Sequence, residues 1–543
     1  MKSRMAIALL AACVAGGIAF AAPAAEEAAV AMAPGPLGAY DPPIQANIVA
    51  QVLVDQQFAD GDSFENNPWT RSWLEELGIE VTPLWIARTD DQYDQKIAVT
   101  IASSDLPDIM LLEQDKLVSL ARAGKLAPLG ALYEEYILPE LREHLDWSPI
   151  TLEAGSVDGE LYALPDYNRQ PFAKYLWIRD DWQDAVGLPD PKTMDDVIEL
   201  ARAFATGDPD GNGKDDTFGL PLDKDFKFLG EGFFAGYGAY PANFIADMWL
   251  ERDGGLEFAG VQPEVRTALG KLREMFDDGL LDPEFVVKDR GAAYGDVAAG
   301  KYGLLYGERW NPAWPLRQFR DNHPDEDWHW VNLPSEDGSV ALSPSNLKPP
   351  TFFAVRADYP NPEAMIKLYN HTYVHGSTRD ADLNEYDEGI VINHVRLFHN
   401  IRMFAGHDLS VRINAALEDG DTSRLSEGRE MKAFNEVKAY ADGDTGVTQN
   451  WISYRVNGPG SPMITVGELY DSDHFVYNQF YGPLGPAYIQ RGATLNSMKE
   501  EIFAKIIIGE EALEAFDTFV EDWYRLGGQD VTDEVNEWWQ TTK

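Results

Sequence analysis

The sequence contains very little cysteine and few basic residues. Cys13 is the only cysteine among 543 residues, so the rest of the chain offers no disulfide partner and no thiol for catalysis or metal binding. Lysine and arginine total 44 against 90 aspartates and glutamates, which gives a formal net charge of −46. Because so few cations are available to neutralise phosphates, this balance excludes nucleic acid as a partner, and it also disfavours anionic membrane surfaces.

The N-terminus has the pattern of an export signal. Lys2 and Arg4 precede an uncharged run that extends to Ala22, so residues 1–22 are predicted to be a signal peptide. Cleavage after Ala21 fits ordinary signal peptidase. The four residues that end at Cys13 instead resemble a bacterial lipobox, in which residues 1–12 are removed and Cys13 is lipidated. Both alternatives predict export to the periplasm or the outer face of the cytoplasmic membrane. Only the second predicts a lipid anchor, through Cys13.

Beyond the signal, residues 23–45 are rich in alanine, proline and glycine and are predicted to form a linker. From Ala46 onward, strand-like and helix-like segments alternate: "ANIVAQVLVD", "NPWTRSWLEELG", "IEVTPLWI", "QYDQKIAVTIAS", "PDIMLL" and "DKLVSLARAG". Repeated β-α-β units predict an α/β fold with a mostly parallel sheet flanked by helices. A chain of this length is too long for one core and predicts two or more compact units.

The segment "GDPDGNGKDDTFG", residues 207–219, has oxygen-bearing side chains at every second position, as in a calcium loop. Numbered from Asp208, the glycine of the sharp turn falls at position 6, but position 12 is Gly219, so the closing bidentate glutamate is missing. A preceding helix capped by Thr193 and a following Pro221 leave room for one helix only, which favours a structural ion over a regulatory one. The alternative is a solvated cluster of Asx turns. The candidate ligands are Asp208, Asp210, Asn212, the Lys214 carbonyl, Asp216 and Thr217.

Two histidines, His371 and His375, lie four residues apart on a predicted helix and could together bind zinc. Residue 372 is threonine, so the glutamate base of an HExxH protease is absent, and a solvated helix face is the favoured interpretation. Adjacent carboxylates could imitate the acid pair of a glycosidase, but in so acidic a chain such pairs carry little information.

Four stretches of the chain carry a family resemblance. They are Tyr175–Leu220, Ala102–Met110, Gly159–Pro165 and Arg491–Trp539. Together they closely resemble the family 1 extracellular solute-binding proteins of carbohydrate ABC importers, in the group of LipO-like and alginate-binding proteins, over about residues 45–543. In the alginate-binding members a calcium loop occupies the position of Asp208–Thr217, and Thr217 stands where those members have glutamate.

The resemblance implies a two-lobed Venus-flytrap protein, each lobe a mostly parallel sheet flanked by helices. It predicts one lobe from residues 46–172 and about 348–445, and a second from 173–347 and about 446–543, joined by a hinge. It also implies a monomeric, non-enzymatic receptor that binds an oligosaccharide between the lobes and delivers it to membrane permease subunits. A secreted, calcium-stabilised glycoside hydrolase or polysaccharide lyase is the alternative. The net charge favours a neutral sugar slightly over a polyuronate.

Sugar sites combine flat aromatic faces with directional polar groups, and the chain has 15 tryptophans and 23 tyrosines. The candidates lie where predicted strands end and at the predicted passage between lobes. Core packing is the alternative for each aromatic. The predicted ligand-binding residues are Asn67, Trp69, Tyr167, Arg169, Arg309, Trp310, Trp314, Trp451 and Tyr481.

Overall fold

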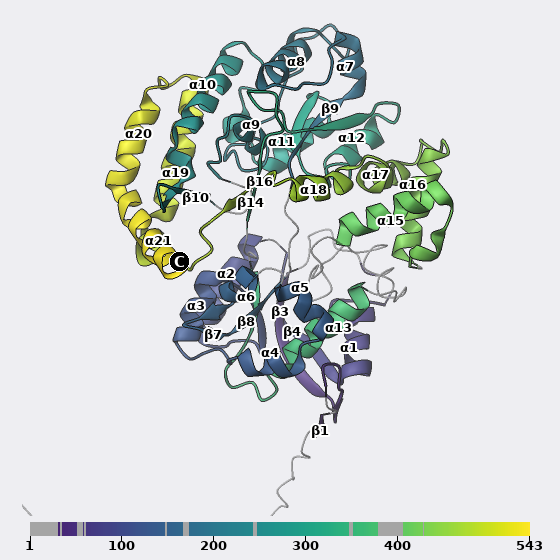
Figure 1. Cartoon of the computed structure of the whole chain (residues 1–543), viewed down its shortest axis with the longest axis vertical. Helices are drawn as coiled ribbons and strands as arrows, with labels where there is room; N and C mark the ends of the chain where they lie inside the picture. The colour runs from purple at the N-terminus through teal and green to yellow at the C-terminus, as the bar shows by residue number, and fades with distance from the viewer. Residues whose placement is uncertain are drawn as a thin grey trace, which may run out of the picture.

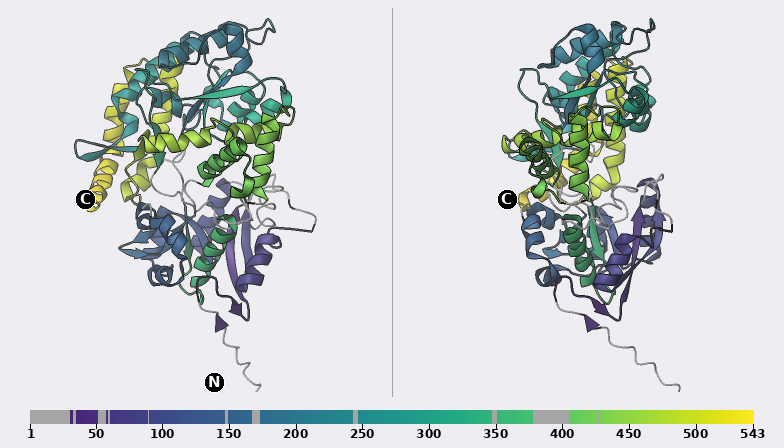
Figure 2. Two further views of the ribbon diagram at one scale, coloured as in Figure 1. Left: turned by 45° about the vertical axis from the view of Figure 1, so that its right-hand side comes forward. Right: turned by 90° about the vertical axis from the view of Figure 1, so that its right-hand side faces the viewer.

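The computed structural model describes residues 31–32, 35–51, 58, 61–88, 90–146, 149–166, 173–242, 247–346, 351–377, 405–426 and 428–543. The predicted signal peptide, Cys13, Tyr167 and Arg169 lie outside these residues. The described chain forms two bodies stacked along the long axis of the molecule (Figures 1 and 2), which we call lobe 1, at the bottom of Figure 1, and lobe 2. Within the described part of the chain, no helix is both long enough and apolar enough to cross a membrane.

Lobe 1 is built around a five-stranded sheet with the order β4-β3-β5-β15-β8. Strand β3 pairs in parallel with both β4 and β5, whereas β15 runs antiparallel to β5 and β8. Strands β4, β3, β5 and β8 therefore run in the same direction, and β15 runs against them. The prediction of a mostly parallel sheet is confirmed for this lobe. The strands are β3 (Ile44–Gln51), β4 (Ile79–Ala87), β5 (Ile109–Glu113), β8 (Ala163–Pro165) and β15 (Thr351–Val355). The helices are α1 (Pro68–Leu77), α2 (Asp90–Ser103), α3 (Gln114–Arg122), α4 (Gly130–Tyr136), α5 (Pro139–Asp146), α6 (Pro149–Ala154) and α13 (Glu363–Ser377).

Lobe 2 contains a three-stranded sheet with the order β12-β9-β13, and both pairings are antiparallel. A mostly parallel sheet was predicted here, so the strand direction differs. All five residues of β9 are buried, which is why this segment resembles a parallel-sheet strand in sequence. The strands are β9 (Tyr175–Arg179), β10 (Trp249–Arg252), β11 (Gly255–Phe258), β12 (Leu304–Gly307), β13 (Trp328–Asn332), β14 (Ser343–Asn346) and β16 (Phe475–Asn478).

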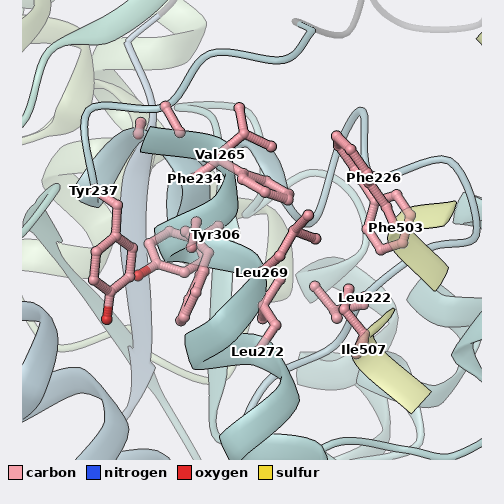
Figure 3. Close-up of a cluster of buried hydrophobic side chains, with 14 of the residues drawn as sticks. Leu222, Phe226, Phe234, Tyr237, Val265, Leu269, Leu272, Tyr306, Phe503 and Ile507 are labelled. Carbon is pink, nitrogen blue, oxygen red and sulfur yellow. The ribbon is translucent and has the colours of Figure 1, made fainter. Parts of the chain in front are cut away.

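The helices that surround these strands come from two stretches of sequence. They are α7 (Asp180–Val186), α8 (Met194–Thr206), α9 (Glu231–Gly236), α10 (Pro263–Asp277), α11 (Arg290–Ala298), α12 (Leu316–Asn322), α15 (Ala405–Asp419), α16 (Arg429–Ala441), α17 (Thr448–Asn457), α18 (Pro462–Asp471), α19 (Pro486–Ile508), α20 (Ala515–Trp523) and α21 (Gln529–Thr541). The largest apolar cluster joins both stretches: Leu269 and Leu272 of α10 lie near Phe503 and Ile507 of α19 (Figure 3).

Helices α15 and α16 belong to lobe 2, which corrects the predicted boundary near residue 445. Ser410 donates a hydrogen bond to Asn457 at 3.0 Å, and Asn414 donates to the Asn457 carbonyl at 2.8 Å. A separate apolar cluster centred on Ile413 and Val437 joins the two helices. The prediction placed them in lobe 1 because their amphipathic pattern does not say which sheet they cover. The chain therefore passes between the lobes between residues 166 and 173, 346 and 351, and 377 and 405.

The end of the predicted linker is also part of lobe 1. Lys367 Nζ on α13 donates hydrogen bonds to the carbonyls of Gly35 and Gly38, at 2.7 and 2.8 Å. Tyr40 is buried, and its hydroxyl donates to Glu363 at 2.7 Å. Residues 35–45 are thus fastened to the lobe. The predicted linker, residues 23–45, is therefore wrong for residues 35–45.

One carboxylate ties α16 and α17 to the lobe 2 sheet. Asp327, just before β13, accepts a hydrogen bond from the Trp451 indole at 2.6 Å and from the Tyr440 hydroxyl at 3.1 Å. The same carboxylate pairs with Arg455 at 2.7 Å. The Trp451 ring is fully buried, so its bulk and its N–H are both used inside the lobe.

We expect Asp327→Asn to lower the stability of lobe 2 by about 2 kcal/mol, because hydrogen bonds to a charged group contribute ~1.5–3 kcal/mol and Arg455 would lose its counter-charge. Thermal denaturation followed by circular dichroism measures the effect. Asp325→Asn, an exposed neighbour with the same charge change, is the matched control. Equal melting temperatures for both variants would contradict this role of Asp327.

Candidate functional site

A compact group of polar and aromatic side chains lies at the end of the lobe 2 sheet where β9 begins and β12 ends, next to the first two passages. Lys174 lies directly before β9, and its backbone N–H donates to the Ser343 hydroxyl at 3.1 Å. Strand β12 ends at Gly307, which is paired with Tyr175 at the start of β9. The loop after β12 therefore begins beside the point where the chain enters lobe 2, on the side from which the chain reaches lobe 1.

A buried ammonium organises this end of the sheet. Lys174 Nζ lies 2.5 Å from Glu308 Oε1 and 2.8 Å from Glu231 Oε2, and all three side chains are almost completely buried. Glu231 opens α9, where the helix dipole favours a carboxylate. Asp223 is also buried, and its charge acts on both Lys174 and Glu231. One ammonium therefore faces three carboxyl groups.

The excess of carboxyl groups shifts their protonation. Burial raises the pKa of Glu231 to about 8, against the opposing attraction of Lys174. Burial, with Asp225 nearby, raises the pKa of Asp223 to about 7. Burial by itself would lower the pKa of Lys174, but Glu231 and Glu308 raise it by more, so the ammonium stays charged. Burial thus favours the protonated form of both Glu231 and Asp223.

The loop after β12 brings three of the predicted residues together. Asn311 is fully buried and accepts a hydrogen bond from the Glu308 backbone N–H at 2.9 Å, which fixes the turn. Arg309 and Trp310 are half-buried, with the guanidinium 5.2 Å from the indole centroid. Burial lowers the pKa of Arg309 from its ordinary value. Trp314 is 44% exposed, the most accessible large aromatic of the group.

Aromatic and basic side chains from two other segments extend this surface. The ring of Tyr294 on α11 meets Trp314 edge to face at 4.5 Å. The Arg290 guanidinium lies 3.9 Å from the centroid of Phe228 and 5.0 Å from that of Trp314. Flat faces beside cationic donors are suited to the C–H faces and hydroxyl edges of a sugar.

Sequence reasoning missed Lys174, Asp223, Phe228, Glu231 and Arg290. One signal was available, because Lys174 directly precedes an apolar strand at the predicted lobe boundary.

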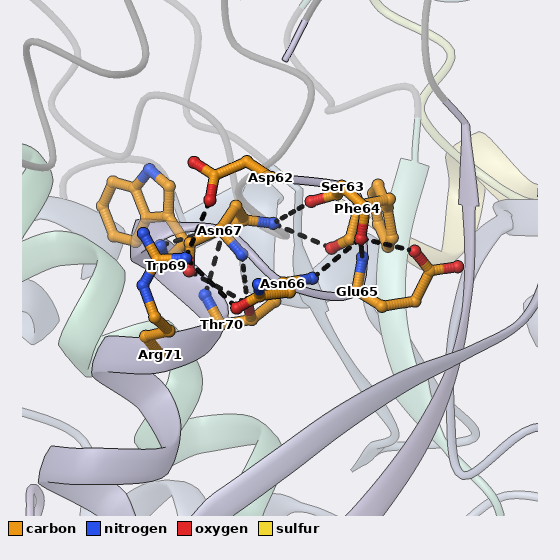
Figure 4. A network of polar contacts seen from close by, with 9 residues as sticks. All are labelled: Asp62, Ser63, Phe64, Glu65, Asn66, Asn67, Trp69, Thr70 and Arg71. Carbon is orange, nitrogen blue, oxygen red and sulfur yellow. Dashed lines mark hydrogen bonds and ion pairs between the residues drawn. The ribbon is translucent and has the colours of Figure 1, made fainter. Parts of the chain in front are cut away.

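In lobe 1, Asn67 and Trp69 have internal roles (Figure 4). The Asn67 side chain caps α1 by accepting from the Trp69 and Thr70 N–H groups, at 2.9 and 3.2 Å, and donates to the Phe64 carbonyl at 2.8 Å. Asn67 and Trp69 are both fully buried. Neither side chain offers a surface to a ligand in this structure, because the helix start and the core already use them.

Trp451 and Tyr481 lie apart from the loop after β12. Trp451 is enclosed in the core of lobe 2. The Tyr481 ring meets Trp538 edge to face at 4.6 Å, and its carbonyl accepts a hydrogen bond from the Gln114 amide of α3 at 3.1 Å. Tyr481 therefore lies where the lobes touch and serves in part as an inter-lobe contact.

The loop after α8 turns its polar side chains inward. Both Asp208 oxygens accept from the Gly213 N–H, at 3.2 and 3.1 Å. The Asn212 amide nitrogen lies 2.7 Å from Asp210 Oδ2 and 3.0 Å from Asp216 Oδ1. Side chains at loop positions 3, 5 and 9 are thus directed toward one another, whereas the position 1 side chain is bonded to the turn at Gly213, and carboxylate and amide oxygens suit Ca²⁺. In donor type these residues fit the ion, but the Asn212 amide would have to turn over, because its oxygen now accepts from the Lys214 N–H at 2.7 Å.

The second half of the loop differs from an EF-hand. Thr217 is buried, and its hydroxyl donates to the Phe204 carbonyl at 2.9 Å, so the hydroxyl serves the end of α8. A Cβ at Gly219 would lie 2.6 Å from the Ala201 side chain, which leaves no room for a glutamate at position 12. Residues 218–230 contain no helix, as Pro221 predicted.

The sequence of this chain is similar to those of known proteins. Residues 55–371 match the family of bacterial extracellular solute-binding proteins. Lipoprotein LipO of Bacillus subtilis is 25% identical over 496 residues, 88% of this chain and 90% of LipO. The fructooligosaccharide ABC transporter substrate-binding protein FusA of Streptococcus pneumoniae is 27% identical over 248 residues, 42% of this chain and 44% of FusA.

Solved structures share the two-lobed fold. The structure of FusA in complex with kestose has a TM-score of 0.60 at 16% identity, over 92% of this chain and 100% of that one. The alginate-binding protein AlgQ2 without calcium ion has a TM-score of 0.61 at 15% identity, over 92% of this chain and 98% of that one. The family match covers more than half of the chain, and LipO aligns along nearly all of it. This chain belongs to the bacterial extracellular solute-binding protein family.

Proposed function

We propose that this protein is the extracytoplasmic substrate-binding protein of an ABC importer, and that it binds an oligosaccharide between its lobes and delivers it to a membrane permease. The observation that carries the proposal is the group of aromatic faces and arginines around Trp314, which belongs to the loop that begins beside the entry of the chain into lobe 2. Membership of the solute-binding family supports it, as does the relative FusA, named for fructooligosaccharides.

A neutral sugar is the ligand proposed, and the cluster around Lys174 is compatible with it, although Arg290 and Arg309 lie on the same surface. The Lys174 ammonium is already matched by Glu231 and Glu308, so it adds no positive charge that a uronate carboxylate could use. The protein's net charge of −46 also slows the approach of an anionic ligand. The receptor acts without chemical turnover, since its role is to release the sugar intact. Export follows from the N-terminal signal, which is removed either as residues 1–22 or as residues 1–12 with Cys13 as the site of lipid attachment.

Calcium is the ion proposed for the loop after α8. Asp208, Asp210, Asn212 and Asp216 supply side-chain oxygens, and Lys214 supplies its carbonyl. The shell is completed by water or by a backbone oxygen rather than by the Thr217 hydroxyl, which is bonded to α8. The ion would hold together a loop whose Asp208, Gly211 and Gly213 all have positive φ. Its role is structural.

The function is tested by incubating the purified protein with a panel of neutral and acidic oligosaccharides. We expect one class of neutral sugar to raise the melting temperature and to be recovered intact. New reducing ends or unsaturated products would instead identify a hydrolase or lyase. Trp314→Ala should weaken binding about tenfold or more, ~1.4 kcal/mol, as measured by calorimetry. Leu526→Ala, at 43% exposure in the same lobe, should leave affinity unchanged.

Removal of calcium provides a second prediction. EDTA should lower the melting temperature of lobe 2 by several degrees, and added Ca²⁺ should restore it, because an ion that binds only the folded loop stabilises it by mass action. Asp210→Ala should abolish this calcium-dependent shift. Asp215→Ala, an exposed neighbour in the same loop, should keep it. A shift that is the same in both variants would mean that calcium binds elsewhere.

The buried carboxyls predict a pH dependence. The pKa of Glu231 is about 8 in the folded protein and ~4.3 in an unfolded chain, so its contribution to stability is full below pH ~4.3 and is lost as pH rises to about 8. Glu231→Gln removes the ionisation. The stability of this variant relative to the native protein should therefore increase from pH 5 to pH 8.5. The expected gain is at least ~1.4 kcal/mol in the free energy of unfolding, seen as a rise in its melting temperature relative to that of the native protein. Glu537→Gln, an exposed control, should show no such trend.

A further inference from the structure

A second group of metal-ligating side chains lies in lobe 1, far from the loop after α8 in sequence and in a different lobe. It consists of Glu76 on α1 and of His371 and His375 on α13. In the described part of the chain, it is the only group of three or more histidine, cysteine or acidic side chains whose ligand atoms all lie within 4.8 Å of one another. The sugar-binding proposal does not use these residues.

The distances within the group suit a transition metal. Glu76 Oε2 lies 3.1 Å from His375 Nε2 and 3.5 Å from His371 Nε2. Ligand atoms bound at about 2.0–2.2 Å in a tetrahedron lie ~3.3–3.6 Å apart, so these separations need little adjustment. The two imidazoles are four residues apart on one helix face, with ring centroids 4.1 Å apart.

The position of His371 contradicts the expectation of a solvated helix face. Its side chain is only 1% exposed, because α13 packs against α1, with the Trp69 ring 6.2 Å away. Burial, and to a lesser extent the neighbouring His375, lower the pKa of His371 to about 3. The ring is therefore neutral, the form in which an imidazole nitrogen can bind a metal.

A single hydroxyl, that of Ser72, lies within hydrogen-bond distance of this nitrogen. The Ser72 hydroxyl lies 2.9 Å from His371 Nε2 and 2.9 Å from Glu76 Oε1, so it either donates to Nε2, or donates to Glu76 and accepts from an Nε2–H. His371 Nδ1 is buried and has no hydrogen-bond partner, so nothing on that side of the ring fixes the tautomer. With a metal on Nε2, the Ser72 hydrogen would be directed wholly to Glu76 and would orient its carboxylate.

The group is accessible from solvent on one side. The Glu76 side chain is 48% exposed and that of His375 is 14% exposed, so an ion can enter without disturbing the core. Three protein ligands also leave a coordination position for water. Two imidazoles select zinc-like ions over calcium or magnesium, which prefer oxygen ligands.

We propose that Glu76, His371 and His375 bind a divalent transition metal ion of the Zn²⁺ class and that this ion fastens α1 to α13. These helices come from the two separate stretches of sequence that build lobe 1, and Glu76 and His375 are 299 residues apart. The ion would thus stabilise the joining of the two stretches. It differs from the calcium loop in ligand type, in lobe and in the metal that it selects.

The test uses the full chain without a histidine tag, stripped with EDTA and then saturated with Ca²⁺ to fill oxygen-ligand sites. Calorimetric titration with Zn²⁺ should show one ion per chain, and Zn²⁺ should raise the melting temperature. Co²⁺ should give the visible absorption of a site with nitrogen ligands. His375→Ala and Glu76→Gln should each weaken Zn²⁺ binding at least tenfold, whereas Glu75→Gln, an exposed neighbour on α1, should bind as the native chain does.

His375 is the preferred histidine variant because its side chain is partly exposed, so its removal disturbs the core less than removal of His371. Circular dichroism before titration establishes that each variant is folded. Absence of Zn²⁺ binding by the native chain would overturn the proposal, because the three side chains would then only hydrogen-bond to one another. Equal affinity in the native chain and His375→Ala would also overturn it, since the ion would then lie elsewhere.

Discussion

The structure depends on the separation of its apolar cores. The buried side chains of the described residues fall into five clusters, and each cluster draws its members from one lobe only. Hydrophobic burial therefore stabilises each lobe internally and contributes little to holding one against the other. Their relative position rests on the chain passages and on polar contacts such as that of Gln114 with the Tyr481 carbonyl. Two rigid bodies joined in this way can enclose a ligand without the unfolding of either.

Some tryptophan side chains pack in the cores and others lie at the surface, and composition alone could not show which. Of the 15 tryptophans, seven in the described part of the chain are fully buried: Trp69, Trp73, Trp177, Trp182, Trp249, Trp328 and Trp451. Much of the aromatic content is thus used by the cores. The exposed ring of Trp314 beside Arg290 is a different case, because its loop is fixed from beneath by buried Asn311 and by the ion pairs of Lys174. The surface proposed to bind the sugar, supported in this way, would be organised before a ligand arrives.

Discontinuous lobes require contacts that join distant stretches of sequence, and this chain uses polar groups for several of them. Lys367 holds residues 35–38 to lobe 1, Asp327 holds α17 to the lobe 2 sheet, and Glu76 meets the histidines of α13. Each group is directional and partly buried, so it specifies one arrangement where apolar packing alone would allow several. In a protein with 90 acidic side chains, most carboxylates are solvated, and those few that meet a buried cation or imidazole are structurally informative.

Local patterns in the sequence determined the β-α-β beginning, the cap of α8 by Thr193, the absence of a helix directly after Pro221 and the family. They did so because caps, turns and amphipathic periods are properties of neighbouring residues. The tertiary structure alone decided the antiparallel direction of the lobe 2 sheet, the membership of α15 and α16, the burial of Trp69 and His371, and the meeting of Lys174 with Glu231 and Glu308. Each of these depends on which faces from separate parts of the chain are buried together, and an amphipathic pattern shows that a face is buried without showing against what.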